Sequence, residues 1–108
     1  MVMNSDLLIM DRIVTFITSL INPEKIVLFG SYARGDNKDN SDIDILIIMN
    51  HLENEREITG LLYKSLLHED ITIPIDFLAI DHDKYNKLKN RTGYIYKTIE
   101  QDGQILYG

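Results

Sequence analysis

Apolar residues recur along the chain with two periods, which predict alternating helices and strands. Steps of three and four residues, typical of one face of an α-helix, cover residues 7–21, roughly 53–68 and 85–99. Short apolar runs rich in isoleucine and valine cover residues 25–29, 42–48 and 71–80, and these predict strands. Residues 104–107 are long enough for a short fourth strand.

Turn-forming residues separate these elements. Asn22-Pro23 ends the first helix, and the string RGDNKDNS at 34–41 predicts a loop. Pro74 indicates a strand start or an edge position. The order of elements predicts a single α/β domain over residues 1–108, in which helices flank a mixed sheet of three main strands.

The last predicted helix carries its own boundary signals. Asp81 is the expected cap at its start, and Gly103 is the expected stop at its end. Gly93 weakens the middle, because glycine is a poor helix former.

Composition narrows the class of protein. The chain has 108 residues, of which 44% are hydrophobic, and it has no cysteine. This length favours one domain, and the lack of cysteine excludes disulfide frameworks, thiolate zinc sites and cysteine nucleophiles. The N-terminus carries acids where a signal peptide carries positive charge, and no apolar run reaches about 18 residues. We therefore expect a soluble cytoplasmic protein without a membrane segment.

The formal charge of −6 is concentrated in one part of the chain. Residues 36–57 contain seven acidic and two basic residues, which accounts for most of the net charge. Duplex DNA is not an expected partner, because phosphate contacts need clustered lysine and arginine.

Two of these acids, Asp42 and Asp44, share one face of a predicted strand. Their Cα atoms should lie about 6.5–7 Å apart, and no lysine or arginine lies within three residues of either. The two charges repel each other, so either both face water at the strand end or a cation lies between them. Oxygen ligands favour a hard ion such as Mg²⁺ or Mn²⁺.

A third acid strengthens the metal hypothesis. Asp76 interrupts the apolar run ITIPIDFLAI, where a carboxylate is costly unless it is paired or binds metal. Carboxylates on two neighbouring strands could hold two ions about 3.5–4 Å apart, the arrangement that supports in-line phosphoryl and nucleotidyl displacement.

The strand before the acid pair ends in Gly30-Ser31, which is suited to phosphate. Glycine permits close approach of the backbone, and the N–H groups and serine hydroxyl there can bind phosphate oxygens. Gly30 and Gly35 have the spacing of a P-loop, but Asp36-Asn37 replaces the required Lys-Ser/Thr pair. A P-loop is therefore excluded.

These motifs together resemble a known family. Gly30-Ser31, ten residues, then Asp42-Ile43-Asp44 resembles the signature of the polymerase-beta-like nucleotidyltransferase superfamily. The fuller string GSYARGDNKDNSDIDILI, with Asp76 and the closing IEQDGQILY, is similar to the minimal nucleotidyltransferases over residues 25–107. The resemblance implies the small nucleotidyltransferase fold.

The resemblance also implies roles for individual residues. Gly30 and Ser31 would hold the triphosphate of ATP, and Arg34 is a further candidate for the phosphate charge. Two Mg²⁺ ions, with Mn²⁺ as a substitute, would be ligated by three catalytic acids. Asp42 and Asp44 would bind both ions, and Asp76 would complete the ion site nearest the attacking hydroxyl and is the candidate to take its proton.

Larger relatives carry a further domain that holds the acceptor, and this chain ends about where that domain would begin. In the minimal group the usual partner is a HEPN-domain ribonuclease toxin, so the resemblance implies a hetero-oligomeric antitoxin that adds AMP to a toxin tyrosine. Two alternatives remain open: transfer to a small hydroxylated molecule such as an aminoglycoside, and a non-catalytic antitoxin that neutralises its partner by binding alone.

Overall fold

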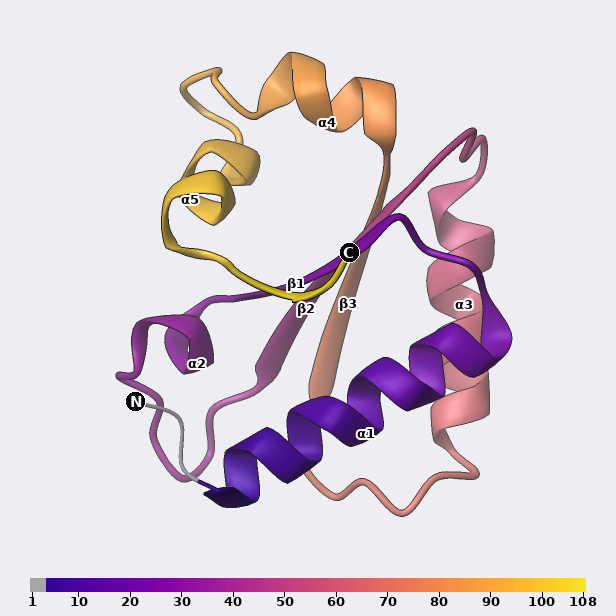
Figure 1. The fold of residues 1–108 in the computed structure, drawn as a ribbon, viewed down its shortest axis with the longest axis vertical. Coiled ribbons are helices and arrows are strands. Elements are labelled where there is room, and N and C mark those ends of the chain that lie inside the picture. The colour runs from indigo at the N-terminus through magenta and orange to yellow at the C-terminus, as the bar shows by residue number, and fades with distance from the viewer. Residues whose placement is uncertain (1–3) are drawn as a thin grey trace.

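The computed structural model describes residues 4–108, which form helices and strands in alternation (Figure 1). Their bounds are α1 (Asn4–Leu20), β1 (Lys25–Phe29), α2 (Ser31–Arg34), β2 (Ile43–Met49), α3 (Glu55–Leu66), β3 (Ile75–Asp81), α4 (His82–Leu88), α5 (Ile95–Asp102) and β4 (Gln104–Tyr107). None of the helices in this part of the chain has the length and apolar character needed to cross a membrane.

The four strands form one mixed sheet in the order β3-β2-β1-β4. β2 pairs with β3 in parallel, whereas β1 pairs with both β2 and β4 in antiparallel fashion. The mixed α/β sheet predicted from the sequence is therefore confirmed, including its short fourth strand. The two central strands, β1 and β2, carry the ends that matter for the candidate site.

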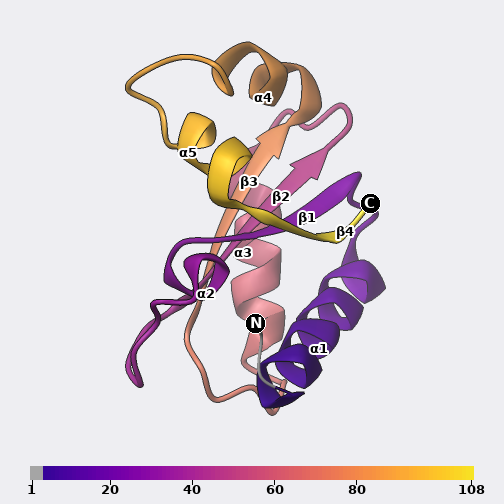
Figure 2. The ribbon, with the colours of Figure 1, turned by 60° about the vertical axis from the view of Figure 1, so that its left-hand side comes forward.

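Helices cover both faces of the sheet, which explains why β2 is apolar along almost its whole length. Ile43, Ile45 and Ile47 are buried against α1 and α3, and Leu46 and Ile48 are buried against α4 and α5. Figure 2 shows the two helix layers on opposite sides of the strands. Full burial of each such side chain contributes about 1.5–3 kcal/mol, so the sheet is a rigid platform for the residues at its ends.

The prediction of one continuous helix over residues 85–99 was wrong. The structure has two helices, α4 and α5, joined by residues 89–94, within which Gly93 takes a positive φ of 96°. Both helices pack on the same face of the sheet, so their apolar residues keep a helical spacing across the break. The expected boundaries are confirmed: the Asp81 side chain accepts a 3.0 Å hydrogen bond from the Asp83 N–H, and Gly103 follows the last turn of α5.

The third strand begins later than the sequence predicted. β3 starts at Ile75, directly after Pro74, whereas Ile71 and Ile73 pack on the core from the preceding loop. Pro74 therefore marks a strand start, as expected, and its carbonyl accepts a 2.9 Å hydrogen bond from the Ile43 N–H. Consequently Asp76 is the second residue of β3 and is exposed, rather than buried in the middle of the strand.

Candidate active site

The candidate site lies where β1 ends and where β2 and β3 begin. Asp44 is paired with Phe29 across the β1–β2 ladder and with Asp76 across the β2–β3 ladder. Neighbouring strands lie about 4.8 Å apart, so these three residues form a row across the sheet. They share the face that α4 and α5 cover, because Leu46, two residues after Asp44, is buried on that face.

Gly30 brings the backbone into contact with the central acid. Its φ of 74° and ψ of −155° lie outside the range that other residues adopt readily. A Cβ atom at this position would lie 2.2 Å from the Asp44 Oδ2 atom. Only glycine therefore allows the Asp44 carboxylate to lie against the end of β1.

A four-residue helix, α2, begins directly after Gly30 and was not predicted from the sequence. The Ala33 and Arg34 N–H groups each donate to the Gly30 carbonyl at 3.1 Å, and the Gly35 N–H donates to the Ser31 carbonyl at 2.9 Å. The first N–H groups of a helix have no partner inside it. The backbone at Gly30-Ser31 thus offers donors of the kind that bind phosphate oxygens.

Electrostatics at Asp44 favour the arrival of positive charge. Burial raises the pKa of Asp44 above its ordinary value, and the nearby carboxylates of Asp76 and Asp42 raise it further. The Arg34 guanidinium acts in the opposite direction. Asp44 is half-buried, whereas Asp42 and Asp76 are exposed. The structure therefore brings the three predicted acids into electrostatic range of one another.

The donor set suits a hard divalent cation, since all three side chains offer carboxylate oxygens. Among the side chains that the structure describes, however, no three acidic or histidine residues are already arranged as the ligands of one ion. Asp44 and Asp76 are held in register on adjacent strands, and Asp42 lies just before β2 at the end of the loop. The chemistry of these side chains fits Mg²⁺ or Mn²⁺, and the exposed Asp42 is the candidate ligand least fixed by the fold.

Arg34 lies beside this site at the end of α2. Its Nε atom is 3.1 Å from the Asp36 Oδ2 atom, and both side chains are well exposed, at 46% and 62%. An exposed ion pair of this kind is weak, so the guanidinium is available to a ligand that carries more negative charge.

A cleft of about 260 Å³ opens beside Asp44, between α2 and α5. Its lining comprises Phe29, Gly30, Arg34, Asp44, Ile95, Thr98, Ile99 and Asp102. The α5 residues were not predicted as part of the site. In the sequence, Ile95 and Ile99 follow helical spacing, which also describes any helix packed on a sheet, and Ile99 and Asp102 belong to the closing string IEQDGQILY. Neither signal by itself puts α5 beside Asp44. Asp76 lies on the opposite side of Asp44, so the site has a cleft side and a β3 side.

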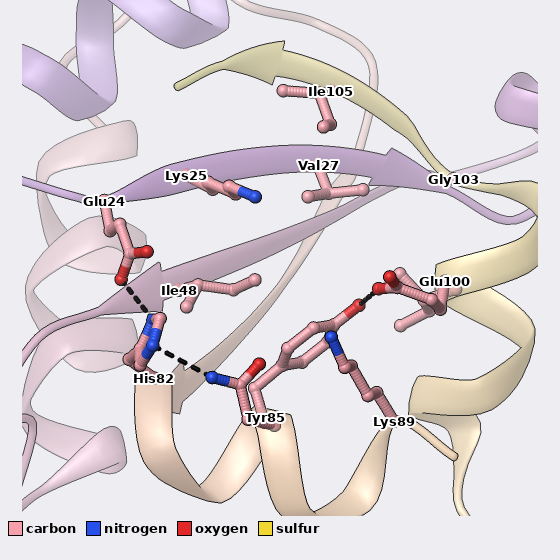
Figure 3. Close-up of a pocket in the computed structure, with 12 residues that line it drawn as sticks. Glu24, Lys25, Val27, Ile48, His82, Tyr85, Lys89, Glu100, Gly103 and Ile105 are labelled. Carbon is pink, nitrogen blue, oxygen red and sulfur yellow. Dashed lines mark hydrogen bonds and ion pairs between the residues drawn. The ribbon is translucent and has the colours of Figure 1, made fainter.

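A second cavity, of about 160 Å³, lies on the same face of the sheet between β1 and the helices α4 and α5 (Figure 3). The His82 Nδ1 atom is 2.6 Å from the Glu24 Oε2 atom, and the Tyr85 hydroxyl donates to Glu100. Burial and this hydrogen bond raise the pKa of Tyr85 above its ordinary value. None of the predicted site residues lines this cavity, and its polar contacts connect α4 to α5 and to the start of β1.

Comparison with known sequences agrees with this geometry. The model of the nucleotidyltransferase domain family matches residues 10–106. One relative from Methanocaldococcus jannaschii, named "Putative protein adenylyltransferase MJ0604", is 34% identical over 84 residues, which span 78% of each chain. Another from the same organism, named "Putative protein adenylyltransferase MJ1217", is 37% identical over 79 residues, which span 73% of this chain and 71% of the relative.

Solved structures share the fold. A crystal structure described as a putative nucleotidyltransferase from Sulfolobus solfataricus has a TM-score of 0.55 and 22% identity, over 91% of this chain and 75% of that one. A toxin–antitoxin crystal structure with AMP-PNP has a TM-score of 0.60 and 24% identity, over 92% of this chain and 73% of that one. The family model matches nearly the whole chain, and the Gly-Ser and acid motifs meet at one end of the central strands. The chain therefore belongs to the nucleotidyltransferase domain family.

Proposed function

We propose that this nucleotidyltransferase transfers AMP from ATP to a hydroxyl of a partner protein, and that this hydroxyl belongs to a tyrosine of a HEPN-domain ribonuclease toxin. The position of Asp44 carries the proposal, because this acid lies between the phosphate-binding Gly30 and the third acid, Asp76. The chain would act as the antitoxin in a complex with that toxin.

The relatives support AMP as the transferred group and a protein of a toxin–antitoxin pair as the acceptor. The two Methanocaldococcus jannaschii proteins are named as adenylyltransferases of proteins. One structure with the same fold is a toxin–antitoxin pair with AMP-PNP, and another is an MntA–HpeT pair in which two aspartates separated by one residue are changed to glutamate. The same one-residue spacing separates Asp42 from Asp44.

In the proposed reaction the two sides of the site have different tasks. The N–H groups at Gly30-Ser31 bind the phosphates that leave as pyrophosphate, and Asp42, Asp44 and Asp76 would hold the cations. Bound Mg²⁺ would supply the positive charge that offsets these carboxylates and the phosphates. The acceptor oxygen forms a bond to the α-phosphorus while the bond from that phosphorus to the bridging oxygen of pyrophosphate breaks.

The acceptor approaches from the β3 side. Asp76 lies on the far side of Asp44 from the cleft, so a triphosphate in the cleft leaves Asp76 next to the opposite face of the α-phosphorus. In-line displacement requires the attacking and leaving oxygens to lie on opposite faces. Asp76 is then placed to accept the proton of the attacking hydroxyl.

The test is incubation of the chain with Mg²⁺ and ATP labelled at the α-phosphate, with and without the proposed HEPN-domain toxin. Label should appear on the toxin and should vanish in Asp42→Asn and Asp44→Asn. Asp39→Asn, an exposed acid in the same charged segment, should keep it. If no label appears and both site variants still neutralise the toxin, the chain acts by binding alone. Label on an added aminoglycoside instead would identify a small-molecule acceptor.

A further inference from the structure

The α5 wall of the cleft carries two polar side chains that the proposed transfer does not use. Thr98 and Asp102 are four residues apart on α5, so they lie on the same face of that helix. Both line the cleft together with Gly30 and Asp44. A ligand that contacts the Gly-Ser backbone and extends along the cleft would therefore meet them.

Among the described residues, Thr98 and Asp102 also make no side-chain hydrogen bond or ion pair. Thr18 and Thr59, two of the three other threonines inside helices, each donate to the carbonyl four residues earlier, at 2.8 and 3.3 Å, whereas the exposed Thr15 in α1 shows no such bond. The Thr98 hydroxyl does not do so. Its hydrogen-bonding capacity and that of the Asp102 carboxylate are available to a ligand.

Charge decides which part of a nucleotide lies along this wall. The Asp102 carboxylate repels phosphate, so the triphosphate lies on the α2 side, beside Gly30 and Arg34. A carboxylate and a hydroxyl suit the vicinal 2′- and 3′-hydroxyls of ribose, since each ribose hydroxyl donates one hydrogen bond and accepts others. The remaining lining of Phe29, Ile95 and Ile99 is apolar and suits the flat faces of a base.

The position of this wall is fixed relative to the phosphate-binding backbone. The Gln104 Nε2 atom, two residues after Asp102, donates a 2.7 Å hydrogen bond to the Ala33 carbonyl in α2. Gly103 between them packs closely, because a Cβ atom there would lie 2.5 Å from the Ile99 carbonyl oxygen. The two walls of the cleft are therefore tied together at its base.

We infer that α5 forms the ribose subsite of the enzyme, with Thr98 and Asp102 hydrogen-bonded to the sugar hydroxyls of the nucleoside triphosphate. The inference rests on the proposed function, because it assumes that the triphosphate binds at Gly30. The chain should therefore bind ribonucleotides more tightly than nucleotides that lack both the 2′- and the 3′-hydroxyl.

The test compares binding of ATP and of 2′,3′-dideoxy-ATP, each with Mg²⁺, by titration calorimetry. Hydrogen bonds to a charged group typically change affinity by roughly tenfold or more. The wild type should therefore bind ATP about tenfold more tightly than the dideoxy analogue. The double variant Thr98→Val, Asp102→Ala should bind the two equally and should bind the dideoxy analogue as the wild type does.

Matched variants control for general effects on the helix. Gln101→Ala, on α5 but outside the cleft lining, and Thr92→Val, in the exposed loop before α5, should keep the tenfold preference. Thr98→Ser should keep the part of the preference for ATP that Thr98→Val loses. A wild type that binds ATP and dideoxy-ATP equally, or a double variant that keeps the preference, overturns the ribose subsite while leaving the proposed transfer in place. A wild type that binds neither nucleotide contradicts the proposed function itself.

Discussion

Gly30 and Asp44 are in such close contact that a single methyl group on the glycine would lie 2.2 Å from a carboxylate oxygen of the aspartate. This contact joins the two motifs of the site, since Gly30 opens the turn proposed to bind phosphate and Asp44 is the central acid of the candidate site. The backbone proposed to bind phosphate and the proposed metal ligand therefore cannot move independently.

Gly30→Ala should abolish most activity. The new methyl must push the Asp44 carboxylate or the start of α2 aside, and a displacement of about 1 Å at a reacting centre can lower kcat/KM roughly 100-fold. The φ of 74° with a ψ of −155°, a combination essentially restricted to glycine, adds about 1–3 kcal/mol of backbone strain. Nucleotide transfer and thermal unfolding measured on the same preparation would show both effects.

Gly35→Ala is the matched control for that substitution. Gly35 is in the left-handed helical region, with a φ of 80° and a ψ of 14°, and no atom lies within 4 Å of the position where its Cβ would lie. Gly35→Ala should lose about 1–2 kcal/mol of stability, less than Gly30→Ala because it adds no clash, and should keep nearly all activity. Equal loss of activity in the two variants would show that strain at the ends of α2, and not contact with Asp44, explains the effect.

The raised pKa of Asp44 predicts that its charge destabilises the metal-free protein. Because the folded state holds the Asp44 proton to a higher pH than the unfolded state, stability falls as pH rises from the ordinary value of 3.8 through the raised pKa. Asp44→Asn should therefore raise the melting temperature at pH 7 by a few degrees, given about 4–8 °C per kcal/mol and partial screening by water. Activity should be lost.

The control is Asp39→Asn, which removes an exposed acid from the neighbouring loop. Its free energy of unfolding should stay within about 0.5 kcal/mol of that of the wild type. At a pH below both pKa values of Asp44 the advantage of Asp44→Asn should disappear. A gain for Asp44→Asn that persists unchanged in acid would contradict the electrostatic explanation.

The sheet could be predicted because its signals are local. β2 is buried on both faces, so its residues form a continuous apolar run, and Asp44 is conspicuous as a charge within it. The Gly-Ser turn could be predicted for the same reason, since Gly30 ends an apolar strand. Asp76 was expected inside an apolar strand, but β3 begins later than predicted and the Asp76 side chain is exposed. The parallel register of β3 with β2 brings Asp76 beside Asp44.

What the sequence did not reveal depends on contacts between distant residues. α2 has only four residues, too few for a helical period to show, and the Ala33 carbonyl near its end is bonded by Gln104, 71 residues away. The break between α4 and α5 was missed because a sheet-facing stripe keeps its spacing on both sides of a loop. The α5 wall of the cleft could therefore be recognised only from the three-dimensional structure, which shows that α5 lies beside Gly30 and Asp44.

Mg²⁺ should raise the melting temperature of the wild type. A ligand that binds only the folded state stabilises it by about 2.7 kcal/mol at 100 times its dissociation constant. Asp76→Ala should reduce this gain, because Asp76 lies in register with Asp44 and removal of a carboxylate weakens a hard cation site. Differential scanning calorimetry over a Mg²⁺ series measures the effect.

Asp70→Ala is the control for Asp76→Ala, since Asp70 is an exposed acid in the loop before β3. It should show the full gain with Mg²⁺. A gain in Asp76→Ala as large as in the wild type would contradict a shared cation site for Asp44 and Asp76.

Gln104 should act as a positioning residue for α2, the helix proposed to bind phosphate. Gln104→Ala removes the donor to the Ala33 carbonyl, at a cost of about 1 kcal/mol in stability. The KM for ATP should rise roughly three- to tenfold, because α2 loses its hydrogen bond to β4 and about 1.4 kcal/mol corresponds to a factor of ten in affinity. Gln101→Ala, an exposed glutamine on α5, should change neither.

The variant Gln104→Glu separates positioning from simple loss of packing. It keeps the size of the side chain but places a carboxylate against a carbonyl oxygen, and two acceptors repel each other. If the hydrogen bond positions α2, the KM for ATP should increase in the order wild type, Gln104→Ala, Gln104→Glu. If side-chain volume alone mattered, the glutamate variant would match the wild type, because a residue of the same size would fill the same space between β4 and α2.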